Sequence, residues 1–137
     1  MDAEVPASSA ETLLVVDDEE MLVELLRRLL ARNGFTALSA MSASEALEKF
    51  EAHRSEIALV ITDLMMPGMD GKALAAELLR RDPNVKILIS TGFTSPADID
   101  DLLASGARDV VMKPYQADKL LEKIRETLRG EQPGETE

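Results

Sequence analysis

Five polar side chains stand directly after short apolar runs of the sequence. They are Asp17, Asp18, Asp63, Thr91 and Lys113. An apolar run bounded by turn residues is typical of a buried strand, so each of these side chains would stand at or near the end of a strand. Asp63 is the most informative, because the run Ile57–Thr62 leads into it and a loop rich in glycine and proline follows. A buried carboxylate needs a partner to stay ionised, and we expect the other four side chains to supply it.

The three acids, the lysine and the threonine would together form a site for a hard metal ion and a phosphoryl group. Carboxylates a few ångströms apart repel one another unless a cation neutralises them. Oxygen ligands without His or Cys favour Mg²⁺, which accepts a phosphate oxygen as a further ligand. Lys113 would balance the charge of a phosphoryl group and Thr91 would donate a hydrogen bond to it. Asp63 would be the attacking oxygen.

Five apolar runs that alternate with amphipathic stripes would position these side chains. The expected strands are Leu13–Val16, Phe35–Ala40, Ile57–Thr62, Val85–Ser90 and Asp109–Met112. The stripes between and after them predict five helices, among them Gly71–Arg81 and a last helix from about Gln116 to Arg129. Unbroken apolar strands that alternate with helices are typical of an α/β, doubly wound parallel sheet with helices on both faces. In such a sheet ligands bind beyond the carboxyl ends of the strands.

Length and composition exclude several classes of protein. A chain of 137 residues suits one domain, which we place at residues 12–129, between a flexible leader or linker (1–11) and an acidic, disordered tail (130–137). The net charge of -11 argues against nucleic-acid binding through phosphate contacts. The chain has no cysteine, no export signal and no apolar run that could span a bilayer. We therefore expect a cytoplasmic protein without membrane contact.

Four motifs make the chain resemble the receiver domain of response regulators in two-component signalling. They are Leu-Val-Val-Asp-Asp, Thr-Asp-Leu-Met-Met-Pro-Gly-Met-Asp-Gly, Ile-Ser-Thr-Gly and Met-Lys-Pro-Tyr. Their order and spacing match the family from about Thr12 to Arg129. The resemblance implies a flavodoxin-like sheet of five strands in the order 2-1-3-4-5, which is the order found in a chemotaxis member of this family.

The resemblance also implies a role for each residue of the site. Asp63 matches the phosphoacceptor, which takes its phosphoryl group from a histidine of a kinase or of a phosphotransfer protein. Asp18 and Asp63 match direct Mg²⁺ ligands, together with the backbone carbonyl of Met65. Asp17 matches the acid that reaches the metal through water. A domain of this kind promotes only its own phosphorylation and dephosphorylation, so we do not expect an enzyme in the ordinary sense.

On the other side of the site, Thr91 matches the hydroxyl that moves toward the phosphoryl group. Lys113 matches the cation that contacts that group, and the Lys113-Pro114 bond matches a peptide that is cis in the family. The expected change in partner affinity would appear on the last helix-strand-helix face, from Pro96 to Arg129.

One position departs from the family pattern, and two apolar positions border the phosphoryl site. The family usually carries Tyr or Phe three residues before the lysine, where this chain has Val110. Either the output switch is weaker, or Phe93 or Tyr115 takes its place. Met65 and Phe93, which border the phosphoryl site in receivers, are both apolar here, and we hypothesise that they hinder an attacking water and lengthen the life of the aspartyl phosphate.

Three other functions fit the residues less well than that of a phosphoacceptor. A receiver-like module that binds partners without phosphorylation is disfavoured by the intact acids, Thr91 and Lys113. A Mg²⁺-dependent phosphohydrolase would want a second acid two residues after its nucleophile, where this chain has Met65. A nucleotide-binding module is weaker still, because no glycine-rich phosphate-binding motif is present. The sequence predicts either a stand-alone receiver or the terminal receiver of a hybrid kinase, and it leaves open whether phosphorylation drives dimerisation.

Overall fold

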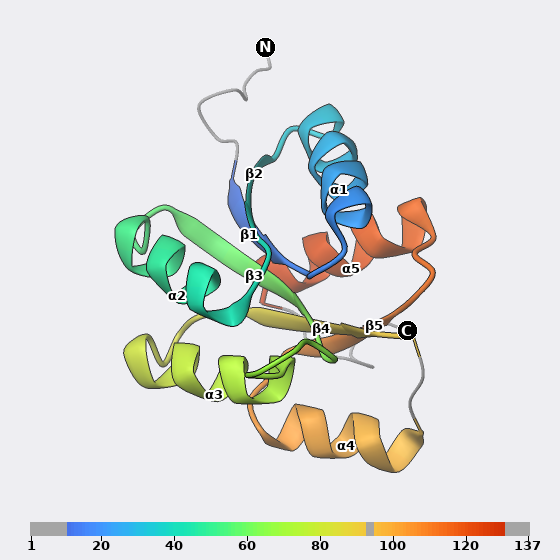
Figure 1. Cartoon of the computed structure of the whole chain (residues 1–137). Helices are drawn as coiled ribbons and strands as arrows, with labels where there is room; N and C mark the ends of the chain where they lie inside the picture. Colours follow the sequence, from blue (N-terminus) through green and yellow to red (C-terminus); the bar gives the residue numbers. More distant parts are fainter. Residues whose placement is uncertain (1–10, 93–94, 131–137) are drawn as a thin grey trace.

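The computed structural model describes residues 11–92 and 95–130. Five strands alternate with five helices along the chain (Figure 1). The strands are β1 (Thr12–Val16), β2 (Thr36–Ala40), β3 (Ile57–Asp63), β4 (Ile87–Thr91) and β5 (Asp109–Met112). The helices are α1 (Glu20–Arg32), α2 (Ala43–Ala52), α3 (Gly71–Arg81), α4 (Pro96–Ala104) and α5 (Ala117–Leu128).

The strands form one parallel sheet in the order β2-β1-β3-β4-β5, which confirms the expected topology. After β1 the chain first adds β2 on one side and then crosses back to place β3 on the other side. The strand order therefore reverses between β1 and β3, and ligands of open α/β sheets bind beside such a point. β1 carries Asp17 just beyond its last residue, and β3 ends on Asp63.

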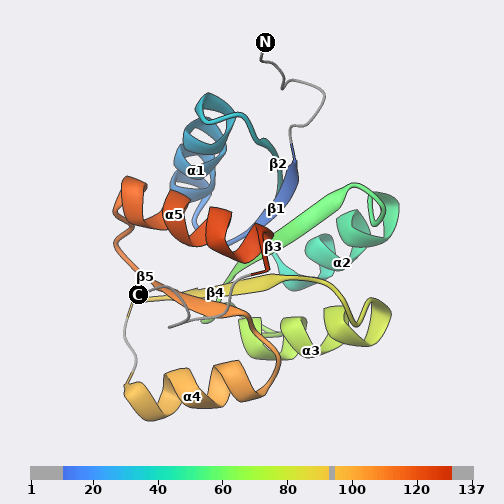
Figure 2. The same cartoon turned by 180° about the vertical axis from the view of Figure 1, so that it is seen from behind.

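Two layers of helices cover the sheet, as the views from both sides show (Figures 1 and 2). Helices α1 and α5 pack on one face, where Leu26, Leu30 and Ile124 meet the strand residues Leu13 and Ile61. Helices α2, α3 and α4 pack on the other face around Phe50, Leu74 and Leu102. The interior strands are buried on both faces, which is why they read as unbroken apolar runs.

Strand bounds differ from the sequence prediction at five places. One of them is the start of β1, which lies one residue earlier than expected, at Thr12. β4 begins at Ile87 rather than Val85, because the Val85 amide donates to the Asp82 carbonyl (3.0 Å) in the turn that follows α3. β4 also includes Thr91, and β3 includes Asp63, so both side chains belong to strand ends rather than to loops. β2 begins one residue later than expected, at Thr36.

Three expectations lie outside the described residues. They concern the leader at 1–10, the tail at 131–137 and Phe93. Within residues 11–92 and 95–130, none of the helices combines the length and apolar character that crossing a membrane would need.

Candidate functional site

Three carboxylates meet at the carboxyl ends of β1 and β3. The two strands are paired so that Val16 lies opposite Thr62, and the next residues along each strand are Asp17 and Asp63. One oxygen from each of Asp17, Asp18 and Asp63 lies within 4.8 Å of the other two. Asp17 and Asp63 are buried, whereas Asp18 is exposed. The cluster thus has a buried floor and a rim that is open to solvent.

The start of α1 holds Asp17 in place. Its Oδ1 accepts a hydrogen bond from the Glu19 amide (3.0 Å), and its own amide donates to the Ala40 carbonyl at the end of β2 (3.2 Å). A short acid that accepts from an amide two residues on is a common way to turn a strand into a helix. Asp17 therefore shapes the turn that leads into α1, and its second oxygen, Oδ2, points toward Lys113.

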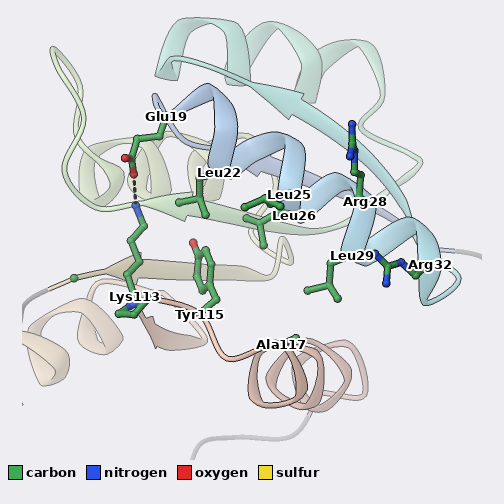
Figure 3. A pocket seen from close by; sticks show the side chains of 12 residues that line it. Glu19, Leu22, Leu25, Leu26, Arg28, Leu29, Arg32, Lys113, Tyr115 and Ala117 are labelled. Atoms are coloured by element: carbon green, nitrogen blue, oxygen red, sulfur yellow. Dashed lines mark ion pairs between the residues drawn. The ribbon is translucent and has the colours of Figure 1, made fainter.

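Lys113 ties the acids together from the end of β5. Its Nζ lies 2.9 Å from Asp17 Oδ2, 3.2 Å from Asp63 Oδ1 and 3.7 Å from Glu19 Oε1. The side chain is 17% exposed, so it is only partly screened by water. Figure 3 shows Lys113 reaching toward Glu19, the one partner of the three that lies on the surface. The Lys113 ammonium therefore offsets part of the charge of three carboxylates.

Burial and charge shift the pKa values of two groups in opposite ways. Burial raises the pKa of the Asp63 carboxyl, the neighbouring Asp17 charge raises it further, and Lys113 partly opposes both. Burial lowers the pKa of the Lys113 ammonium, but its pairs with Asp17 and Asp63 outweigh that effect and raise the pKa overall. Lys113 thus stays charged, and the negative charge of Asp63 is only partly offset by its surroundings.

The remaining predicted residues surround this cluster. Thr91 ends β4 and is buried, and its carbonyl accepts a hydrogen bond from the Lys113 amide (2.9 Å). Met65 lies in the loop after β3 with 72% of its surface exposed. The Lys113-Pro114 peptide is cis, as the resemblance implied. Val110 is buried in the core on the α4 side of the sheet.

The donor set of the cluster suits Mg²⁺. All of its ligand atoms are carboxylate oxygens, which a hard cation prefers, and the exposed side leaves room for water and a further oxygen ligand. Burial and the Asp17 charge raise the pKa of Asp63, and Lys113 opposes them only in part, so a further cation would stabilise the ionised carboxylate. Asp17, Asp18 and Asp63 are therefore the residues that would hold the ion.

A groove beside the site was not predicted from the sequence. It has a volume of about 800 Å³ and lies between α1 and the segment that joins β5 to α5 (Figure 3). Lys113 and Glu19 border one end, Tyr115 lines the groove, and Arg28 and Arg32 lie along α1. Leu25, which also lines it, is 62% exposed although it belongs to the leucine stripe of α1.

Sequence reasoning also missed the contact of Glu19 with Lys113. Glu19 belongs to the acidic run Asp17–Glu20, and the only available signal was its place just before a helix, where acids are common for electrostatic reasons. Whether Glu19 or Glu20 turns toward the lysine depends on the helix start, which the sequence places only within a residue or two.

We expect Asp63→Asn to raise the free energy of unfolding at pH 7 in EDTA. The folded-state pKa of Asp63 lies above its ordinary value of 3.8, so the folded protein prefers the protonated form and ionisation at higher pH lowers stability. The advantage of the variant should therefore shrink as the pH falls through the folded-state pKa and level off below 3.8. Urea unfolding of both proteins from pH 3 to 8 measures it, and a constant difference across that range would contradict the prediction.

Comparison with known proteins agrees with the fold. Residues 13–125 match the response regulator receiver domain family. The chemotaxis protein CheY of Bacillus subtilis is 32% identical over 120 residues, which cover 87% of this chain and 98% of that protein. The DNA-binding response regulator MtrA of Mycolicibacterium smegmatis is 38% identical over 119 residues, which cover 87% of this chain but 51% of MtrA.

Two solved structures extend the comparison. A response regulator receiver domain protein from Clostridium thermocellum superimposes with a TM-score of 0.83 at 28% identity, over 88% of this chain and 95% of that one. CheY in the CheX-CheY-BeF3-Mg complex from Borrelia burgdorferi gives a TM-score of 0.80 at 27% identity, over 83% and 86% of the two chains. The chain belongs to the response regulator receiver domains, the phosphoacceptor signalling domains of two-component systems.

Proposed function

We propose that the chain accepts a phosphoryl group from a phosphohistidine onto Asp63 in a Mg²⁺-dependent reaction. The observation that carries the proposal is the position of Asp63, a buried carboxylate at a strand end with Lys113 3.2 Å away and two further acids within reach. Burial and the Asp17 charge raise the pKa of Asp63. A buried carboxylate charge in this setting is stabilised when a cation binds beside it, and it is removed from the oxygen when that oxygen forms a bond to phosphorus.

The transfer balances as a simple displacement. An Asp63 carboxylate oxygen forms a bond to phosphorus, the bond from phosphorus to the histidine nitrogen breaks, and the electron pair of that bond stays on the imidazole. Lys113 offsets the negative charge that gathers on the phosphoryl oxygens, and the buried floor of the site keeps bulk water away from the new acyl phosphate. Thr91 is placed at the neighbouring strand end to donate a hydrogen bond to the transferred group.

Mg²⁺ would be held by Asp18 and Asp63 with the backbone carbonyl of Met65, and Asp17 would reach it through water. When bound, the ion supplies positive charge to the phosphoryl oxygens. The chain's own contribution is to hold the carboxylates together before the ion arrives, through the Lys113 pairs and the Glu19 amide that fixes Asp17.

Output would follow from the link between Thr91 and Lys113. Both flank α4, β5 and α5, and the backbone hydrogen bond between them joins β4 to β5. To convert a population that is almost all inactive to one almost all active, phosphorylation must favour the active form by about 5.5 kcal/mol. We propose that this change alters partner binding on the face formed by α4, β5 and α5.

The phosphodonor is proposed to be a histidine kinase or a histidine phosphotransfer protein. Its histidine must reach Asp63 from the open rim, so its surface must lie beside the mouth of the site. The groove along α1 begins there at Lys113 and offers exposed Leu25 together with Arg28 and Arg32. A donor helix with an apolar face and acidic flanks would match it in shape and charge.

The proposal further places the domain in the cytoplasm, with no membrane or nucleic-acid contact through its own surface. Support comes from the net charge of -11, which opposes contact with phosphate backbones. The curated relative MtrA is named as DNA-binding, but this chain matches only half of its length. Phosphorylation-dependent pairing of two copies would be seen by comparing the mass in solution before and after phosphorylation.

Incubation with acetyl phosphate and Mg²⁺, followed by intact mass measurement, tests the proposal. We expect the wild type to gain one phosphoryl group, with no gain in EDTA or in Asp63→Asn, since that variant lacks the attacking oxygen. Asp100→Asn, which changes an exposed acid on α4, is the matched control and should be labelled like the wild type. Absence of an adduct in the wild type would instead favour a module that binds partners without phosphorylation.

A second test concerns the lifetime of the aspartyl phosphate. Met65 is exposed and lies two residues after Asp63, where an apolar side chain cannot hold a water in line for attack. Met65→Asn should therefore release phosphate several times faster than the wild type, whereas Met65→Leu should match the wild type. The decay of the adduct mass after removal of acetyl phosphate gives both rates. Equal decay in Met65→Asn and Met65→Leu would show that the side chain does not control water access.

A further inference from the structure

The sheet register separates two sets of side chains near the site. Val110 and Ile89 lie in the core on the α4 side, whereas Val111 and Leu88 lie in the core on the side of α1 and α5. Ser90 pairs with Val111 and with Asp63 across the sheet, so the three side chains share the face of α1 and α5. A signal from Asp63 thus has a route to that face that does not pass through the α4 side.

Ser90 carries a buried hydroxyl whose hydrogen bonding is not satisfied. It is 0% exposed, and within residues 11–92 and 95–130 its Oγ has no hydrogen-bond partner of normal geometry. Tyr115 packs against the same buried cluster as Val111, the residue paired with Ser90, so the phenol and the serine hydroxyl share one region of the core. The pKa of the Tyr115 phenol agrees with this placement, because burial raises it and the Ser90 hydroxyl partly opposes that effect. An unmade hydrogen bond in a core is costly, so a small movement that completes this bond would be favourable.

Tyr115 connects this hydroxyl to the groove along α1. Its ring packs against the core on the α1 and α5 face and also lines the groove. In Figure 3 the ring stands beside the Lys113 side chain, with its hydroxyl end directed toward α1. Only Pro114 separates Tyr115 from Lys113, so a shift of the Lys113 backbone is passed on through a stiff residue.

We propose that Tyr115 is a positioning residue that makes the α1 groove sensitive to the state of Asp63, by closing its phenol onto the Ser90 hydroxyl when Lys113 engages a phosphoryl group. The proposal rests on the proposed function and adds to it a regulated surface. In the unphosphorylated protein Lys113 is held by Asp17, Asp63 and Glu19. Once Asp63 carries the phosphoryl group, Lys113 turns to the new charge, its contact with Glu19 at the mouth of the groove is lost, and Tyr115 moves inward.

Such a movement would give the groove two forms. The unphosphorylated form keeps the Tyr115 ring as a wall of the groove, next to Leu22 and Leu26. The phosphorylated form withdraws it toward Ser90. A phosphodonor that fits the first form would bind the second form more weakly, and it would therefore dissociate after the transfer.

The chain offers a direct probe of this movement, because Tyr115 is its only tyrosine and it contains no tryptophan. The tyrosine ultraviolet difference spectrum and fluorescence therefore report on Tyr115 alone. We expect beryllofluoride with Mg²⁺ to change both signals in the wild type, beyond the effect of Mg²⁺ alone. Ser90→Ala, which removes only a hydroxyl without a partner, should lose more than half of the change.

Fluorine NMR verifies in each sample that the beryllofluoride adduct is saturated, which separates this proposal from the proposed function. An adduct without a change in the tyrosine signals, or with the same change in Ser90→Ala, would overturn the role of Tyr115. No adduct in the wild type would overturn the proposed function and this proposal together.

Methyl NMR then tests the groove itself. With the adduct saturated, the methyl groups of Leu22 and Leu26 should shift in the wild type and shift less than half as much in Tyr115→Phe, which keeps the ring but loses the hydroxyl. The double variant with Ser90→Ala should show no further loss, because both changes break one link. The methyl of Met112, which pairs with Thr91 on the other side of the sheet, is the internal control and should shift equally in all samples. Equal shifts of Leu22 and Leu26 in the wild type and Tyr115→Phe would overturn the proposal.

Discussion

Replacing Lys113 with methionine is expected to lower the free energy of unfolding by about 2 kcal/mol in EDTA. The change removes the cation that pairs with Asp17 and Asp63, whose side chains are only 2% and 9% exposed. Breaking a fully buried ion pair typically costs about 3–5 kcal/mol. The smaller figure applies here because Lys113 is partly solvated and because Asp63, with its raised pKa, can take up a proton.

Mg²⁺ should largely remove this penalty, because a divalent ion neutralises the same carboxylates that lose the ammonium group. A ligand at a hundred times its Kd stabilises the folded state by about 2.7 kcal/mol, and the gain should be larger in Lys113→Met than in the wild type. Urea unfolding with and without Mg²⁺ gives the four free energies that are needed. A Mg²⁺ effect of equal size in both proteins would show that the ion and Lys113 do not share the carboxylates.

Lys113→Met should also lower the rate of phosphorylation. Removing a positive group from the position where phosphoryl charge develops typically costs about 100-fold in rate, and Mg²⁺ should not restore it. The rate of acetyl phosphate labelling, followed by intact mass, measures the loss. Lys119→Met, at an exposed position on α5, is the matched control and should label at the wild-type rate. A Lys113→Met variant that labels as fast as Lys119→Met would remove Lys113 from the proposed mechanism.

The sequence predicted the location of the site because strand ends are encoded locally. An apolar run that stops at Asp63 or just before Asp17 predicts a strand end, and parallel topology brings such ends to one edge of the sheet. The strand order itself came from the family resemblance and not from local patterns, since nothing in an apolar run says which strand lies beside it. The structure confirms both the order and the approach of the three acids.

What the sequence could not predict depends on side-chain geometry within one or two residues. Glu19 reaches Lys113 only because α1 begins at Glu20, and the sequence does not fix that start. Leu25 reads as a core leucine from its spacing, yet it is 62% exposed and lines a groove. The stripe of α1 is wider than the part of it that meets the sheet, and periodicity alone cannot tell which edge of a stripe stays outside.

The proximity of Ser90 and Tyr115 was hidden for a different reason. The serine is an ordinary residue in a strand, and the tyrosine lies beyond Lys113-Pro114. Ser90 faces α1 and α5 because it pairs with Val111 on β5, and Tyr115 packs against the same cluster after β5 has ended. The sequence offers Tyr115 as a substitute for the missing aromatic at Val110, but identifying the hydroxyl near it requires the strand register.

Gly71→Ala is expected to destabilise the protein by about 3 kcal/mol. It should also slow phosphorylation, because it displaces Asp63. A Cβ on Gly71 would lie 2.3 Å from the Asp63 carbonyl oxygen and 2.9 Å from the Leu64 Cα. Both atoms belong to the backbone, so neither can turn away as a flexible side chain would. The Gly71 amide also donates to the Leu64 carbonyl (2.8 Å), which holds the start of α3 against the end of β3.

The clash must therefore be relieved by moving the strand end that carries Asp63 or the helix that packs on it. A shift of about 1 Å in a reacting group can cost about 100-fold in rate, so acetyl phosphate labelling should fall by more than the loss of folded protein explains. Gly68→Ala is the matched control, because Gly68 has a φ of 77° but open space around its Cβ. It should cost about 1 kcal/mol through backbone strain alone and leave labelling unchanged. If Gly71→Ala unfolds like Gly68→Ala and labels at the wild-type rate, then the close approach of α3 to Asp63 does not position the phosphoacceptor.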